Sequence, residues 1–254
     1  MSDAALLDEF IAFAAAPRGP VEGAFLVGRA IDPGFDVDWC RAELARLASG
    51  AGRHALELVA HLRAQGFTGA KDYYRVGNSS LTEVLRTRRG IPISLAMVVA
   101  GVAEQRGMVA VGINFPSHFL VAVEGVLIDP FTMLPADRGE CEAWLEARGM
   151  AVEGAFKSAS ATEVMLRMLN NLRLLALGQG DHSRALELSD YQLAVAAERL
   201  PLHLERVESW LALGVTGMAR HELESALALA DNAALRQQIA ARIAALESRP
   251  SSLN

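Results

Sequence analysis

The stretch "RRGIPISLAMVVAG", residues 88–101, decides the fold because a charged turn leads directly into a long apolar segment. Pro92 stands at the first helical position, where proline is favoured, and Gly107 is suited to end the helix. The pattern therefore predicts a buried helix. Ser94 lies in its first turn, where a helix N-terminus lowers the pKa of a nucleophile and offers N–H groups to an oxyanion. The helix start is thus either a catalytic position or an ordinary capped end.

Helices are also predicted before this stretch. Apolar residues at helical spacing predict a first helix to about Ala16, and residues 21–35 are interpreted as a short connector with room for another helical turn. A helical block follows over residues 36–66, opened by an aspartate as N-cap and broken by glycines near its middle. After a turn-rich loop, Ser80 and Glu83 have the spacing of a capping box and predict a short helix before residue 90.

After Gly107 the periodicity changes to that of strands. The segments "MVAVGINF", "HFLVAVEG" and "VLIDPF" are short, rich in valine and separated by proline or glycine, and they predict three strands of an antiparallel meander. Asp137, Glu140 and Glu142 then predict a solvated acidic loop. Helices followed by a sheet indicate the α+β class, not an alternating α/β fold.

From about Ala161 the sequence is helical throughout. Gly180 matches Gly217 at a period of 37 residues, and Leu-x-x-Leu-Gly before a turn predicts helix pairs similar to tetratricopeptide repeats, whose nominal period is about 34 residues. We therefore expect two domains, residues 1–158 and residues 159–254. Helix pairs of this kind usually bind proteins.

Composition excludes several classes of function. The net charge is −6 and no basic stripe is present, which argues against a nucleic-acid binder. Cys40 and Cys141 lie in no Cys/His cluster, so neither a zinc site nor a disulfide framework is indicated. The first residues lack the positive charge of a signal peptide. The longest apolar stretch is shorter than the roughly 20 residues that cross a bilayer. We expect a soluble cytoplasmic protein that does not bind membranes.

Three polar residues stand where secondary structure alone does not require them. Ser94 starts the apolar helix, His118 starts the second strand, and Asp129 ends the third. A nucleophile, an imidazole and an orienting carboxylate on separate elements follow the logic of a catalytic triad. Each also has a structural interpretation: Ser94 can cap its own helix, a histidine at a strand start can be structural, and Asp-Pro commonly starts a turn.

These residues belong to motifs that resemble a known family. The segments "RGIPIS" at 89–94, "FPSHFL" at 115–120 and "IDPF" at 128–131, followed by tetratricopeptide-like helices, resemble the bacterial "regulator of sirC expression" family. The resemblance implies a transglutaminase-like domain with a papain-like core, joined to tetratricopeptide repeats. It also implies a Cys–His–Asp triad, with His118 and Asp129 at the histidine and aspartate positions.

The resemblance places no nucleophile at the cysteine position. By the family's spacing that position falls on Pro92, which can neither attack nor be activated. Ser94 lies two residues further on, about 200° around a helix of 3.6 residues per turn. Ser117 also stands where a glycine commonly precedes the histidine. The resemblance therefore implies a vestigial or altered triad.

Other residues around the motif are candidates for the cleft. Asn78, Arg88 and Arg89 surround the helix entrance, together with the motif aromatics Phe119 and Phe131. Arginine can bind a carboxylate or phosphate through two parallel hydrogen bonds. Alternatively, the arginines pair with Glu83 and cover the helix start. No phosphate-binding loop, dinucleotide motif or metal-ligand cluster is present, so no cofactor and no metal are expected.

Three functions remain open from the sequence. The first is a non-catalytic binding and regulatory protein, a pseudoenzyme whose cleft and helical repeat hold a protein or peptide partner. The second is a hydrolase or acyl transferase that uses Ser94, His118 and Asp129. The third is a structural adaptor in which both halves only scaffold. The oligomeric state is not predicted.

Overall fold

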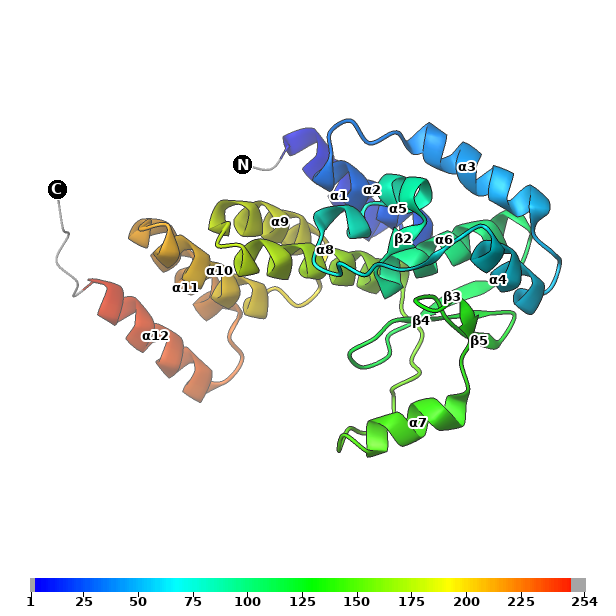
Figure 1. Cartoon of the computed structure of the whole chain (residues 1–254). Helices are drawn as coiled ribbons and strands as arrows, with labels where there is room; N and C mark the ends of the chain where they lie inside the picture. The colour runs from blue at the N-terminus through cyan, green and yellow to red at the C-terminus, as the bar shows by residue number, and fades with distance from the viewer. Residues whose placement is uncertain (1–2, 248–254) are drawn as a thin grey trace. The chain divides into compact units, whose positions relative to one another are not determined.

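Helix α6 (Pro92–Gln105) is surrounded by other elements in the computed structural model, which describes residues 3–247 (Figure 1). Every residue from Pro92 to Ala103 is buried. A helix that is apolar on all sides must be covered on all sides. Its main neighbours are four helices and two strands: α2 (Pro20–Ile31), α3 (Val37–Gly50), α4 (Ala55–Ala64), α5 (Leu81–Thr87), β3 (Ala110–Ile113) and β4 (Leu120–Val123). The predicted buried helix is confirmed.

The sheet is a four-stranded antiparallel meander in the order β3-β4-β5-β6. Strands β5 (Val126–Asp129) and β6 (Leu134–Pro135) complete it. Glu124 and Gly125 connect β4 to β5 with φ values of 49° and 80°, as a two-residue type I′ turn requires. In the register Val121 opposes Ile128, which brings the start of β4 beside the end of β5. The three predicted strands and the α+β class are confirmed.

Two predicted loops are helices in the structure. Residues 21–35, predicted as a connector, mostly form α2, because Pro20 occupies its first turn and its glycines admit close packing. A Cβ on Gly28 would lie 2.2 Å from the ring of Phe35. The predicted acidic loop is largely α7 (Arg138–Glu146), whose first turn is capped by the Asp137 carboxylate accepting from the Glu140 N–H at 2.9 Å.

Other N-terminal predictions are mostly confirmed. Helix α1 (Ala4–Ala15) forms as predicted, and Asp36 caps α3 by accepting from the Trp39 N–H. The capping box of Ser80 and Glu83 is wrong, since the Ser80 side chain makes no capping hydrogen bond. Helix α5 ends at Thr87, and the next residue, Arg88, adopts left-handed φ. Arg89–Gly90 then forms strand β2, which pairs in parallel with β1 (Thr68–Gly69). The one-turn helix η1 (Val76–Ser79) lies between these two strands in the sequence.

Packing divides the described chain into two units. One contains residues 12–171, and the other contains residues 3–11 with residues 172–247. The division falls inside α8 (Ala161–Gly178), whereas the predicted boundary between residues 158 and 159 precedes that helix. That residues 1–158 and 159–254 are two separate domains stays a prediction.

Helix pairs build the second unit. Helices α8 and α9 (His182–Val195) are joined by a short turn, as are α10 (Leu200–Ala212) and α11 (Thr216–Leu229), and α12 (Ala233–Glu247) follows. Gly180 and Gly214 both adopt a φ of 74° in these turns, at positions 34 residues apart. Gly217 lies within α11, so its pairing with Gly180 is wrong. The spacing of the two turn glycines, Gly180 and Gly214, equals the nominal tetratricopeptide period. None of the described helices is long and apolar enough to cross a membrane.

A buried charge network ties α9, α10 and α11 together. The Arg206 guanidinium donates to the carboxylates of Glu222 at 2.6 Å and Asp190 at 2.7 Å. His203 and Trp210 also hydrogen-bond to Glu222. Burial alone would raise the pKa of Glu222, but the hydrogen bonds from His203 and Arg206 outweigh it and lower that pKa.

We expect Glu222→Gln to lower the free energy of unfolding at neutral pH by about 3 kcal/mol, because it leaves the buried Arg206 charge without its closest partner. The folded-state pKa of Glu222 is lowered, so its stabilisation exists above the ordinary carboxyl range and is lost as the pH falls through the lowered value. The difference between wild type and variant should therefore shrink in acid. Urea unfolding at several pH values measures it, and Glu224→Gln in an exposed pair is the control. Equal losses in both variants would refute the role of burial.

Candidate functional site

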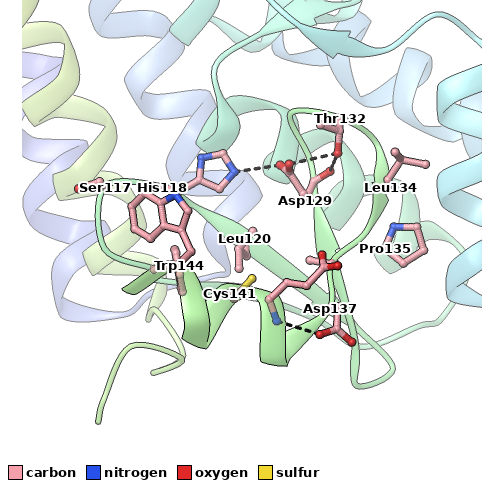
Figure 2. A pocket seen from close by; sticks show the side chains of 13 residues that line it. Ser117, His118, Leu120, Asp129, Thr132, Leu134, Pro135, Asp137, Cys141 and Trp144 are labelled. Atoms are coloured by element: carbon pink, nitrogen blue, oxygen red, sulfur yellow. Dashed lines mark hydrogen bonds and ion pairs between the residues drawn. The ribbon is translucent and has the colours of Figure 1, made fainter. Parts of the chain in front are cut away.

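His118 and Asp129 form a hydrogen-bonded pair at the end of the sheet (Figure 2). The His118 Nε2 atom lies 2.9 Å from the Asp129 Oδ1 atom, and their side chains are 29% and 25% exposed. The antiparallel register explains the meeting, because His118 precedes β4 and Asp129 ends β5. The structure therefore brings two of the three predicted triad residues together.

Further hydrogen bonds fix the Asp129 carboxylate. Its Oδ1 atom accepts from the Phe131 N–H at 2.8 Å, and its Oδ2 atom accepts from the Thr132 hydroxyl at 3.1 Å. Burial raises the pKa of Asp129, but the hydrogen bonds from His118 and Phe131 outweigh burial and hold it below its ordinary value. The carboxylate is thus ionised at neutral pH and orients the imidazole ring.

Arg167 of α8 holds the loop that carries His118. Its guanidinium donates to the backbone carbonyl of His118 at 2.5 Å and to the Asn114 side-chain oxygen at 2.5 Å, and it lies 5.3 Å from the Phe119 ring centroid. Ser117 in this loop adopts a φ of 58°, the left-handed region that favours glycine. The sequence does not point to Arg167, because this residue lies 49 positions after His118. It also belongs to the predicted helical region, residues 159–254.

Ser94 does not join the pair. It is fully buried, and its hydroxyl donates to the Asn78 carbonyl at 2.6 Å while accepting from the Ile91 N–H at 3.1 Å. The structural interpretation of Ser94, a cap at the start of its own helix, describes these bonds. Asn78 is itself buried, and its side chain donates to the carbonyls of Asp72 and Tyr73, which fixes the loop before α5.

The arginines of the helix entrance bind protein groups. Arg88 pairs with Glu43 at 2.6 Å and stacks on the Phe67 ring, and Arg89 donates to the Gly66 carbonyl at 2.5 Å. The alternative pairing of these arginines with Glu83 is wrong, since Glu83 pairs with Arg86. Arg89 and Asn78 also line a cavity of about 300 Å³ with seven other residues: Ala70, Lys71, Asp72, Arg75, Gly77, Glu83 and Thr87.

Three other candidates lie in packed positions. Pro92 is buried at the start of α6. Phe119, predicted at the cleft, is 1% exposed, and its ring lies so close to Gly112 that a Cβ there would be 2.7 Å away. The Phe131 ring covers Gly69 of β1, where a Cβ would approach it to 2.3 Å. Phe119 therefore belongs to the core, and Phe131 joins the Asp129 turn to the small parallel sheet.

A cavity of about 460 Å³ opens beside His118 and Asp129. Figure 2 shows its wall, which runs from this pair past Leu134 and Pro135 to α7. The other lining residues are Phe115, Ser117, Leu120, Thr132, Ala136, Asp137, Glu140, Cys141 and Trp144. Ser94 and Pro92 are not among them. A cavity of this size matches those that hold small ligands or single side chains.

Cys141 reaches this cavity, although its sequence position after the last predicted strand argued against a role. Helix α7 folds back and turns the thiol toward the wall (Figure 2). Burial raises the pKa of Cys141, and the charges of Asp129, Asp137 and Glu140 raise it further. The thiol is therefore protonated at neutral pH, which makes it a poor nucleophile. Among residues 3–247, no three His, Cys, Asp or Glu side chains form a group that could hold a metal ion.

Comparisons with known proteins identify a family that this chain resembles over half of its length. A family model described as the transglutaminase-like superfamily matches residues 38–170. A UPF0162 protein of Pseudomonas aeruginosa is 29% identical over 205 residues, which are 78% of this chain and 76% of that protein. Mouse F-box only protein 21 is 32% identical over 161 residues, 57% of this chain but 25% of its own length. Protein SirB1 of Salmonella typhimurium is 24% identical over 190 residues, 66% of this chain and 71% of its own. No solved structure matches significantly.

We expect Ser94→Ala to lower the free energy of unfolding by roughly 1–3 kcal/mol, because it removes the hydroxyl from the buried Asn78 carbonyl and Ile91 N–H and leaves them only their long mutual hydrogen bond of 3.4 Å. Thermal and urea unfolding measure the change. Ser49→Ala is the control, since that serine is exposed on α3 and bonds only to its own helix. A loss no larger than the control's would contradict a capping role for Ser94.

We expect Arg167→Met to destabilise the protein by about 2 kcal/mol, since charged donors to buried carbonyls are worth more than neutral ones. The local effect should exceed the global one: the His118 amide should exchange with solvent faster than amides of α6. Hydrogen exchange followed by NMR measures both. Arg138→Met is the control, because that guanidinium is on the surface and pairs with Glu142. Unchanged exchange at His118 would show that Arg167 does not hold the loop.

Proposed function

Because this chain belongs to the transglutaminase-like superfamily, we propose that it is a binding and regulatory protein that has lost acyl-transfer chemistry at this site. The cavity beside His118 and Asp129 receives a segment of a protein or peptide. The similarity to SirB1 supports the resemblance to the "regulator of sirC expression" family, and with it a regulatory role.

One observation carries the proposal: the His118–Asp129 pair has no activated nucleophile beside it. The position that the family's spacing assigns to cysteine holds Pro92, which is buried. The Ser94 hydroxyl is engaged by backbone groups. Cys141 shares the cavity, but its raised pKa keeps it protonated. Covalent catalysis needs a nucleophile within hydrogen-bond reach of its base. The Nε2 atom of His118 bonds to Asp129, as in the base of a triad, but among residues 3–247 no serine or cysteine forms a hydrogen bond with the other ring nitrogen.

The two alternatives are less well supported. A hydrolase built on Ser94 would have to break the hydroxyl's bond to the Asn78 carbonyl, and Ser94 lines neither the cavity beside His118 nor the one beside Asn78. A purely structural adaptor would leave no free concave surface at the motif, whereas a cavity of about 460 Å³ lies there. A binding role requires such a cavity and does not require a nucleophile.

The helical unit offers a second surface for a partner. Large apolar side chains are exposed at the turn between α10 and α11, with Leu213, Val215 and Met218 each about 40% exposed. Exposed apolar groups that lie close together commonly mark protein interaction sites. This supports the proposal that the repeat region binds a protein.

Turnover assays test the loss of catalysis. We expect the purified full chain to hydrolyse ester, amide and peptide probes no faster than His118→Ala, because no nucleophile is activated. A fluorophosphonate should not label Ser94, and iodoacetamide should label Cys141 only slowly at neutral pH. Mass spectrometry of labelled peptides identifies the sites, and the unfolded chain serves as the control for probe reactivity. Hydrolysis that requires His118, together with labelling of Ser94 or Cys141, would overturn the proposal.

A further inference from the structure

The cavity beside His118 carries charge of mainly one sign. Three carboxylates line it, those of Asp129, Asp137 and Glu140, and they come from two neighbouring parts of the chain, the end of β5 and the start of α7. Of the described residues that line it, only His118 can become positive, and its Nε2 atom already faces Asp129. An anionic ligand would therefore meet repulsion, and a cationic one would meet attraction.

The arginines of α7 and of its C-terminal end are turned elsewhere. Arg138 stacks on the Phe156 ring with its guanidinium 4.2 Å from the centroid and pairs with Glu142. Arg148 stacks on the Trp144 ring at 3.9 Å. Neither guanidinium lines the cavity. The carboxylates of the cavity are thus not neutralised by the arginines of α7 and its C-terminal end.

The three carboxylates differ in how free they are. Asp129 already accepts from His118 and two further donors, so it adds negative charge to the cavity but does not provide the direct contact to a ligand. Asp137 uses one oxygen to cap α7 and has a second oxygen to offer. Among residues 3–247, no side chain forms a hydrogen bond or ion pair with the Glu140 carboxylate. Direct contacts to a ligand cation would come from Asp137 and Glu140.

The cavity also has apolar walls that suit an aliphatic stem. Leu120 lies between His118 and α7, and Leu134 and Pro135 lie on the other side of Asp129 from His118 (Figure 2). Long cationic side chains place their methylene groups against apolar surface and their charge at a polar end. Cys141 lines the same cavity, where burial raises the pKa of its thiol and the surrounding carboxylates raise it further.

Resting on the binding role proposed above, we infer that this cavity takes a cationic side chain of a bound peptide, a lysine ammonium or an arginine guanidinium. The methylene stem lies along Leu134 and Pro135. The charge lies between Asp137 and Glu140, with Asp129 adding attraction from the far side. The ligand class is a basic peptide segment.

Two pairs of peptides test the inference on the full chain. An acetylated and amidated Gly-Ala-Arg-Ala-Gly is compared with its citrulline counterpart, and the lysine peptide with its acetyl-lysine counterpart. Backbone NMR shifts are followed at low salt. We expect saturable shifts at Thr132, Asp137, Glu140 and Cys141 with the charged peptides, and binding at least about tenfold weaker for the neutral ones, as charge-assisted hydrogen bonds imply.

Variants separate specific contacts from general attraction. Glu140→Gln and Asp137→Asn should each weaken binding of the arginine peptide roughly fivefold, and asparagine preserves the helix cap. Glu146→Gln is the matched control, since it removes one acid from the same helix but outside the cavity, and it should leave binding unchanged. All three variants are isosteric with the wild type, so each is expected to fold, and unfolding curves verify this.

Three outcomes would overturn the inference. Equal binding of charged and neutral peptides at the cavity would refute the cationic class while leaving the binding role intact. Equal weakening by Glu140→Gln and Glu146→Gln would show diffuse attraction to an acidic protein. Absence of shifts at the cavity with every peptide would also refute it, and the turnover assays above decide separately whether catalysis has been lost.

Discussion

The burial of α6 on every side is the constraint on which the rest of the larger unit depends. A helix with no polar face cannot meet solvent, so four helices and two strands are arranged around it. Its N-terminus lies inside the protein, where unpaired N–H groups are costly. Pro92 has no N–H to satisfy, and Ser94 supplies a hydroxyl for the Ile91 N–H. Pro92, at the position that the family's spacing assigns to cysteine, and Ser94 close a buried helix end.

The elements that could be predicted from the sequence are those with a strong local period. The apolar run of α6 and the valine-rich strands β3 to β5 are of this kind. Helix α2 is not predicted because its glycines and Pro20 locally indicate turns. In the structure Gly28 leaves space for the Phe35 ring to pack against the helix. Helix α7 was missed because its acidic residues suggested a solvated loop, and only its N-cap and the buried Leu145 mark it as a helix.

For the site, the sequence predicted the pair but not its surroundings. His118 and Asp129 meet because of strand register, which follows from the short turn between β4 and β5. Arg167 and Cys141 come from segments separated from the pair by helices or loops, and no local pattern shows that they return to it. The predicted cleft role of Phe119 is wrong for a related reason. The alternation of side chains along a short strand does not show that Arg167 covers the Phe119 ring.

Arg167 has a consequence for how the protein can be divided. It lies on α8, after the boundary predicted at residues 158 and 159 but inside the segment of 38–170 that matches the superfamily. A truncated protein ending at residue 158 would keep His118 and Asp129 while losing the guanidinium that holds the His118 carbonyl. The smallest fragment with an intact site therefore includes the first turns of the repeat region. Although α8 crosses the division between the two packing units, Arg167 lies in the same unit as His118 and Asp129, residues 12–171.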